Sequence, residues 1–427
     1  MNECPLKLAR GIFMKLDLMD MLYAISFALE KAEIEIFGVD TGHNRRVACL
    51  CMFMAEKMGM EGEDLRDYIG CCILHDNALT EYINEELRRS PAMKESKTQL
   101  SDMTGKESAA LKSSHSVIGE QNIHLIPFRT NVENIILYHH ENADGSGTMG
   151  KTAADTGLKS QILHLADSVD MNFRLSTMTK AEFDETSKWV QSQSGKLFSE
   201  TAVKLFCDGV TYENISYLQN IGAIACLRRK IPAETCDYSN EEIHDIAEMF
   251  ARIIDYKSEF TQTHSLGVAA KAEQMANYYG FDPEKTTRYY FAGALHDIGK
   301  LVVSNNILEK PGRLTENEFA TMKDHASATY YILDKMKGIS DILEWASNHH
   351  EKLNGKGYPR GLTAKELSFE ERLMACIDIY QALTEKRPYK DGMSHEKTIA
   401  IMRDMADRGE LDETIVRDME VVMARLR

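Results

Sequence analysis

The chain lacks several features that would place it in other classes of protein. Only 8 of its 427 residues are prolines, and Met, Leu, Ala, Glu and Lys are abundant, a composition that favours helices. No apolar run approaches the ~18–20 residues that a membrane-spanning helix needs. Charged residues (Lys15, Asp17 and Asp20) stand where a signal peptide would be apolar. The nine cysteines form no CxxC pair, so we expect buried thiols in a reduced cytoplasm.

An excess of basic residues is also missing, because the net charge is −16 at pH 7. A chain without a basic field does not attract phosphate backbones, so we expect no binding to nucleic acid polymers or to anionic membranes. A small anionic ligand in a local basic pocket remains compatible with this charge. With 43% hydrophobic and 27% charged residues, the chain has the composition of a globular protein and the length of two or three domains.

The chain does contain one set of histidines and aspartates written twice. The first copy is His43, His75, Asp76, His115, His139, His140 and Asp167. The second copy is His264, His296, Asp297, His325, His349, His350 and Asp378. In both copies the first histidine lies 32 residues before the His-Asp pair, and the lone histidine lies 24 residues before the His-His pair. Imidazoles and carboxylates at repeated positions predict a duplicated metal-binding module.

The repeat extends to the segments around these residues. Segments 55–76 and 276–297 have equal length and the same layout. In each copy, a helix is predicted to begin near the first histidine and to run 16 residues to a glycine, Gly59 or Gly280, which suits a helix C-terminus. A second helix then carries the His-Asp pair. Because no segment alternates with a period of two, we predict an all-α fold of two tandem helical modules.

The boundary between the modules is predicted in segment 228–239, which combines charge, a proline and small polar residues. This gives an N-terminal domain over 1–235 and a C-terminal domain over 236–427. Ser239 with Glu242 forms a predicted capping box at the first helix of the second domain. The segment from about 179 to 227 is predicted helical and either closes the first module or joins the two.

The second copy has the ligands of a two-metal centre. The two oxygens of Asp297 can bridge two cations, with His264, His296 and Asp378 completing one site. His325, His349 and His350 complete the other. Ligands limited to nitrogen and oxygen favour iron, manganese or zinc. Two such metals can activate water for attack at phosphorus, so the chemistry predicted is hydrolysis of a phosphate ester.

Further groups in the second copy suit a phosphate-containing substrate. Lys300 lies one turn after the His-Asp pair, and Arg387 and Lys390 follow Asp378 by 9 and 12 residues. The segment HHEKLNGKGYPRG leaves the metal site through a glycine-rich loop. Its residues Gly357, Tyr358 and Pro359 would provide close backbone approach and a rigid apolar surface beside a base or ribose.

These motifs (HDIGK, HHEKLNGKGYPRG and ALT-x-x-RPYK) resemble the HD-GYP family of the HD phosphohydrolase superfamily, and the tandem of an HD and an HD-GYP domain resembles a known arrangement within it. The resemblance implies a metal-dependent phosphodiesterase that opens cyclic di-GMP to pGpG and in some members cleaves it to GMP. It implies that the second copy supplies the metal ligands. Lys300, Arg387 and Lys390 match positions that contact substrate phosphate, and Asp297 and Lys300 are the expected catalytic residues.

The resemblance also implies a metal centre containing iron or manganese, with zinc, nickel and magnesium as alternatives. Trinuclear members have a glutamate four residues before the first histidine, where this chain has Phe260. Two metals are therefore expected.

The first copy keeps every metal ligand but has lost the substrate groups. Leu79 stands in the place of Lys300, and the loop after His140 has no Tyr-Pro pair. Ser176 and Thr179 stand where the second copy has the basic residues Arg387 and Lys390. We therefore expect a degenerate HD domain whose role is regulatory or structural, with or without metal.

Three alternatives remain open. The enzyme could prefer another dinucleotide, such as cyclic GMP-AMP or a linear one, because the motifs do not specify base selectivity. The protein could be a nucleotide sensor without catalysis, or the first domain could be the sensor for the second. A homodimer or a signalling partner protein would fit each of these roles.

Overall fold

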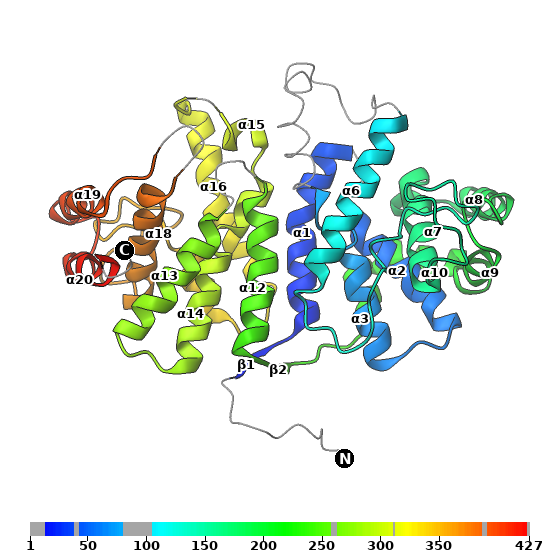
Figure 1. The fold of residues 1–427 in the computed structure, drawn as a ribbon, viewed down its shortest axis with the longest axis horizontal. Coiled ribbons are helices and arrows are strands. Elements are labelled where there is room, and N and C mark those ends of the chain that lie inside the picture. The colour runs from blue at the N-terminus through cyan, green and yellow to red at the C-terminus, as the bar shows by residue number, and fades with distance from the viewer. Residues whose placement is uncertain are drawn as a thin grey trace, which may run out of the picture. The chain divides into compact units, whose positions relative to one another are not determined.

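The computed structural model describes residues 13–37, 42–79, 105–257, 263–310, 312–386 and 391–424. These residues form helices and one short two-stranded sheet (Figure 1), which confirms the predicted all-α fold. The chain divides into two compact units. The N-terminal unit is Leu18–Glu234, and the C-terminal unit joins Met1–Asp17 to Thr235–Arg427. Among the described residues, the expected domains differ from these units chiefly at residues 13–17, which group with the C-terminal half.

The sheet explains that grouping. Strand β1 (Phe13–Leu16) pairs antiparallel with β2 (Cys236–Ser239), with Phe13 opposite Ser239 and Leu16 opposite Cys236. Met14 and Leu16 alternate with Lys15 along β1, and both apolar side chains are fully buried. The start of the described chain is therefore tied to the segment that opens the C-terminal unit.

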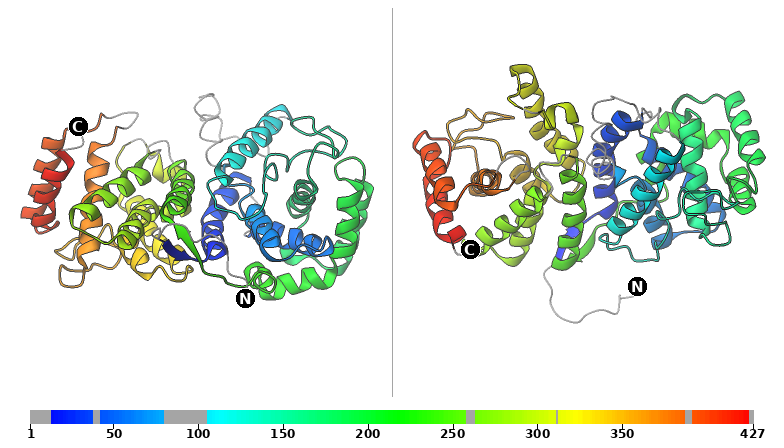
Figure 2. Two further views of the ribbon diagram at one scale, coloured as in Figure 1. Left: turned by 60° about the horizontal axis from the view of Figure 1, so that its bottom comes forward. Right: turned by 45° about the horizontal axis from the view of Figure 1, so that its top comes forward.

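In the N-terminal unit, α8 to α11 curve around its edge (Figure 2). Its elements are α1 (Leu18–Phe37), α2 (His43–Lys57), α3 (Gly62–Ile73), α6 (Gly105–Ile123), α7 (Leu158–Asn172), η2 (Leu175–Thr177), α8 (Lys180–Ser192), α9 (Glu200–Gly209), α10 (Tyr212–Ile221) and α11 (Ala223–Arg228). The segment after 179 thus belongs to this unit.

The C-terminal unit is built around α13 and α14, and α19 and α20 lie side by side at its edge (Figures 1 and 2). Its helices are α12 (Asn240–Asp255), α13 (His264–Tyr278), α14 (Pro283–Leu295), η3 (Ile298–Val302), α15 (Asn305–Leu308), α16 (Glu316–Leu333), α17 (Ser340–Ser347), α18 (Phe369–Thr384), α19 (His395–Asp407) and α20 (Glu413–Met423).

Local sequence signals fix the helix ends that carry the site. α2 and α13 begin at the first histidine of each copy, and Gly59 and Gly280 follow their ends with positive φ, as predicted. The capping box of Ser239 and Glu242 is also present at the start of α12. Within the C-terminal unit, Gly293 lets α14 approach α13 closely, because a Cβ there would lie 2.9 Å from the Cα of Ala269. This contact brings the ligands at the ends of the two helices together. Within the part of the chain that the structure describes, no helix has the length and apolarity to cross a bilayer.

Candidate metal centres

The seven predicted ligands of the second copy converge in the C-terminal unit. They come from the start of α13, the end of α14, the middle of α16, the end of α17 and the middle of α18. Six of them are buried: His264, His296, Asp297, His325, His349 and Asp378. The seventh, His350, has a side chain 27% exposed. Residues spread over more than 110 positions of sequence therefore form one compact cluster open on the side of His350.

Asp297 lies between two groups of histidines. Its Oδ2 is 3.1 Å from Nε2 of His296 and 3.6 Å from Nε2 of His264. Its Oδ1 is 3.5 Å from Nε2 of His325 and 3.8 Å from Nε2 of His349. Each oxygen of one carboxylate thus faces a different pair of imidazoles, which is the arrangement expected of a ligand that bridges two cations.

Asp378 also contacts a histidine of each group. Its Oδ1 is 3.2 Å from Nε2 of His264, and its Oδ2 is 3.8 Å from Nδ1 of His350. The geometry therefore yields three groups that could hold a metal ion: His264 with His296 and Asp378, His325 with His349 and His350, and His296 with Asp297 and His349, the last sharing one residue with each of the others.

The hydrogen bonds of the imidazoles fit a metal centre. Nδ1 of His296, His325 and His349 each lies 2.6–2.7 Å from the backbone carbonyl three residues earlier. A carbonyl only accepts, so each Nδ1 carries the proton and each Nε2 presents a lone pair to the cluster. Among the described residues, these three Nε2 atoms are buried and make no hydrogen bond. Buried acceptors without partners are costly, and divalent metals would satisfy them.

Electrostatics keeps most of the ligands in the protonation state that metals require. Burial and the neighbouring imidazoles of His350 and His296 hold the pKa of His349 well below its usual range. Burial alone would raise the pKa of Asp297, but His296 and Lys300 outweigh it, so this pKa lies well below the ordinary value. Neutral imidazoles and ionised carboxylates are the forms that bind metal.

Two supporting contacts escaped the sequence reasoning. Glu385 Oε2 is 3.1 Å from Nδ1 of His264 and so orients the first ligand. The sequence did offer one signal for this contact, because Glu385 is a carboxylate two helical turns (seven residues) after Asp378. Thr329 donates through Oγ1 to the carbonyl of His296 and accepts from the N–H of Gly299, both at 3.0 Å. A Cβ at Gly299 would lie 1.9 Å from the carbonyl oxygen of His325, so only glycine fits there.

Of the residues predicted to contact substrate, those that the structure describes lie beside the same cluster. Lys300 Nζ forms an ion pair with Oδ2 of Asp297. The ring of Tyr358 lies 4.7 Å from the ring of His350, and its peptide bond to Pro359 is cis. A Cβ at Gly357 would lie 2.4 Å from the Cα of Glu351, so the loop folds tightly back on itself. Arg387 and Lys390 lie outside the described residues.

Glu351 holds this loop in place. Its Oε1 accepts hydrogen bonds from the N–H groups of Arg360 (2.7 Å) and Gly361 (3.0 Å), and its Oε2 accepts from Leu362 (2.9 Å). A buried carboxylate that satisfies three backbone donors fixes the loop geometry without any regular secondary structure.

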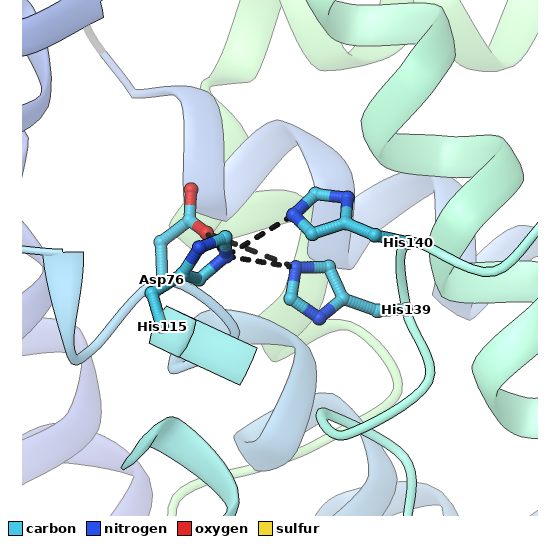
Figure 3. Close-up of side chains that lie close together, drawn as sticks. All are labelled: Asp76, His115, His139 and His140. Carbon is cyan, nitrogen blue, oxygen red and sulfur yellow. Dashed lines mark hydrogen bonds and ion pairs between the residues drawn. The ribbon is translucent and has the colours of Figure 1, made fainter. Parts of the chain in front are cut away.

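The N-terminal unit contains a second cluster of the same design. Figure 3 shows the rings of His115, His139 and His140 converging with the carboxylate of Asp76. Nε2 of His115 lies 3.4 Å from Oδ1 of Asp76 and 3.1 Å from Nε2 of His140. A second set consists of His43, His75 and Asp167, and it includes a 3.2 Å contact between Nε2 of His43 and Oδ1 of Asp167. The structure thus brings together all seven predicted residues of the first copy.

The support around His43 differs between the copies. Nδ1 of His43 lies 2.7 Å from Oδ2 of Asp170, and Arg46 binds both oxygens of that carboxylate at 2.7 and 2.8 Å. In the second copy the corresponding positions are Gly267 and Gln381, and Glu385 takes the role of Asp170. Sequence reasoning missed this buried contact.

The loop scaffold is also retained in the first copy. Glu141 accepts from the N–H groups of Met149 (2.7 Å) and Lys151 (2.6 Å), as Glu351 does in the second copy. Thr148, however, stands where the second copy has Tyr358, and Leu79 stands where it has Lys300. The first copy therefore preserves the ligand geometry and lacks the groups expected to contact a substrate.

Comparison with known proteins agrees with this duplicated architecture. An HD-domain family profile matches residues 41–172, and a second HD-domain profile matches residues 248–415. The chain is a tandem HD-domain phosphohydrolase. HD domains bind divalent metals, and both matches contain one of the two clusters described above.

Several curated relatives are similar over one or both HD domains. A Vibrio cholerae protein named 3'3'-cGAMP-specific phosphodiesterase 1 is 28% identical over 96% of this chain and 93% of its own length. A cyclic di-GMP phosphodiesterase of Thermotoga maritima is 33% identical over 42% of this chain and 49% of its own length. The crystal structure of a cyclic GMP-AMP-specific phosphodiesterase of V. cholerae superposes with a TM-score of 0.64 at 22% identity, covering 96% of this chain and 98% of that one. That superposition shows the same tandem fold.

Proposed function

We propose that the C-terminal HD domain is a metal-dependent phosphodiesterase that hydrolyses a cyclic dinucleotide. The observation that carries this proposal is the position of Asp297, whose two oxygens face separate pairs of histidines while Lys300 and Tyr358 lie at the edge of the same cluster. The names of the relatives agree with this class of reaction.

Divalent metals held by the seven ligands would supply Lewis-acid activation of water and of the phosphodiester. The nitrogen and oxygen ligands favour two iron or manganese ions, with zinc, nickel and magnesium as alternatives. Lys300 would stabilise negative charge on the phosphate from its place beside Asp297. Arg387 and Lys390 are proposed as further phosphate contacts, and Gly357, Tyr358 and Pro359 as the wall beside a ribose or base.

The candidate substrates for this site are cyclic di-GMP and 3'3'-cGAMP, the two dinucleotides for which the relatives are named. Hydrolysis of the first would give pGpG and, after a second cleavage, GMP. The extent of the alignments favours the mixed dinucleotide, because a relative named as specific for 3'3'-cGAMP matches nearly the whole chain. The relatives named for cyclic di-GMP match 32–43% of it.

For the N-terminal domain we propose a second metal centre with a regulatory or structural role. It has the same ligand geometry, with Nε2 of His75 buried and without a hydrogen bond among the described residues. It has Leu79 and Thr148 in place of Lys300 and Tyr358. Metals bound there would tie α2, α6 and α7 together. A cytoplasmic location, where the buried thiols of this domain stay reduced, is part of the proposal.

The test compares matched variants of the two copies. The protein is loaded anaerobically with Fe(II) or Mn(II), its metal content is measured, and products from cyclic di-GMP and 3'3'-cGAMP are separated by chromatography. We expect wild type to give linear products, Asp297→Ala to give none, and Asp76→Ala to lose metal while conversion persists.

Three outcomes would contradict the assignment. Conversion that survives Asp297→Ala but not Asp76→Ala would place catalysis in the N-terminal domain. Tight binding of a dinucleotide without turnover by the metal-loaded protein would favour a sensor. A metal content unaffected by Asp76→Ala would argue against the second centre.

A further inference from the structure

A strip of side chains leads outward from the C-terminal metal centre. The Tyr358 ring lies 4.7 Å from the His350 ring and 6.3 Å from the His325 ring. Nζ of Lys323 lies 5.9 Å from the centre of the same Tyr358 ring. The same Nζ lies 5.1 Å from the centre of the Phe319 ring. The strip thus ends on the first turn of α16.

Phe319 is exposed on the first turn of α16. A lysine and a phenylalanine four residues apart are ordinary neighbours on a helix surface. Here, however, the lysine also faces an aromatic ring from the loop that follows His350, and the phenylalanine remains 48% exposed. The exposed Phe319 ring, linked through Lys323 and Tyr358 to the ligand cluster, offers a stacking surface to a planar ligand.

The helix start that carries the strip is capped. Thr315 and Glu318 form a capping box at the start of α16, and Lys310 forms an ion pair with Glu318. Lys323 forms no ion pair or hydrogen bond with any described residue, so its ammonium group is available to a ligand. The capping box holds the backbone of the turn that carries Phe319, and Lys323 contacts two rings while keeping its hydrogen-bonding capacity.

The first copy shows that the strip is separable from metal binding. Counting back from the lone histidine, the first copy has Ala109 in place of Phe319 and Ser113 in place of Lys323. The same copy has lost the tyrosine of the loop and the lysine after the His-Asp pair, while it keeps all seven ligands. Four groups at the edge of one site are therefore absent together, which indicates that they serve one purpose.

We propose that Phe319 and Lys323 form the recognition site for a purine base of the substrate. A nucleotide whose phosphate is held at the metals extends by its ribose and base past Tyr358 towards α16. The Phe319 ring stacks on the base, and Lys323 donates a hydrogen bond to an acceptor on its edge. Guanine offers two adjacent acceptors, O6 and N7, where adenine pairs an acceptor with a donor, so the site favours guanine. This inference rests on the proposed phosphodiesterase function.

The test measures KM and kcat of the metal-loaded full chain for 3'3'-cGAMP and cyclic di-GMP. Bis(4-nitrophenyl) phosphate, a phosphodiester without a base, serves as a parallel substrate. We expect Phe319→Ala and Lys323→Ala each to raise KM for the dinucleotides about tenfold, the scale of a lost base stack. Values for the small substrate and the metal content should stay at wild-type levels. Phe319→Trp should restore KM, because it keeps a stacking surface.

The control is Tyr331→Ala, which removes another exposed aromatic ring from the same helix. It should not change KM for either class of substrate. Dinucleotide turnover by wild type with KM unchanged in Phe319→Ala and Lys323→Ala would overturn this inference and leave the proposed function standing. So would an equal rise of KM for the small substrate. Absence of dinucleotide turnover by the metal-loaded wild type would overturn both.

Discussion

The contact between Arg46 and Asp170 offers a sharp test of how the N-terminal centre is supported. Arg46 and Asp170 are both only 8% exposed, and two charge-assisted hydrogen bonds join them. Arg46→Met would leave the Asp170 carboxylate buried and in contact with His43. Removing one member of a buried ion pair typically costs about 3–5 kcal/mol, because the other charge stays out of water. We expect a loss of this size in the free energy of unfolding of the N-terminal unit.

The assay follows this unit alone. The chain has two tryptophans, Trp189 in α8 of the N-terminal unit and Trp345 in α17 of the C-terminal unit. In a Trp345→Phe background, urea unfolding of the chelator-treated protein would be read from Trp189. Its ring packs 5.2 Å from that of Phe173 and so reports on the folded unit.

The matched control is Arg66→Met, which breaks a more exposed ion pair with Glu234 in the same unit. Exposed pairs contribute about 1 kcal/mol or less. The double variant Arg46→Met with Asp170→Leu should recover most of the stability, since no buried charge remains. If Arg46→Met cost no more than Arg66→Met, the argument that Arg46 neutralises a buried carboxylate would be refuted.

Three further predictions concern the C-terminal unit. Gly299→Ala should lower metal occupancy of this unit, measured by elemental analysis, because its Cβ would push against the His325 carbonyl; full occupancy would contradict the close packing. Lys300→Met should reduce kcat by about 100-fold or more with metal content retained, and an unchanged kcat would exclude a role in charge stabilisation. Burial raises the pKa of Asp255 to about 7, although hydrogen bonds from Ser265 oppose the shift. The folded state therefore holds this proton more tightly than the unfolded state, so its contribution to stability is complete below about pH 4 and is lost as pH rises through 7. Between about pH 4 and 7, the unfolding free energy of the metal-free protein should therefore fall faster with rising pH in wild type than in Asp255→Asn. The difference between the two slopes should be about 1.4 kcal/mol per pH unit, read from Trp345 in a Trp189→Phe background. Parallel slopes would contradict that reasoning.

The sequence predicted much of the site because its information is local or repeated. The helix starts at His43 and His264 and the capping box at Ser239 depend on neighbouring residues, which the chain displays directly. The duplicated spacing identified the residues that gather in both clusters, because the same fold must present the same residue types at the same positions. It also showed which copy had lost its substrate groups.

The contacts that support the ligands could only be found in the tertiary structure. Asp170 lies 127 residues from His43, and Glu385 lies 121 residues from His264, and neither belongs to the repeated pattern because each copy uses a different carboxylate. The pairing of β1 with β2 could not be predicted from the sequence either, because nothing local in a four-residue strand specifies which distant segment it pairs with.

The sequence by itself thus determined the helical class, the duplication and which residues gather in the two clusters. The tertiary structure decided which oxygen of Asp297 faces which histidines, which side chains hold the ligands in place, and that Lys323 lies near the rings of both Phe319 and Tyr358. The reason is physical. Residue type and spacing are properties of the chain, whereas a contact between distant side chains exists only once the helices have packed.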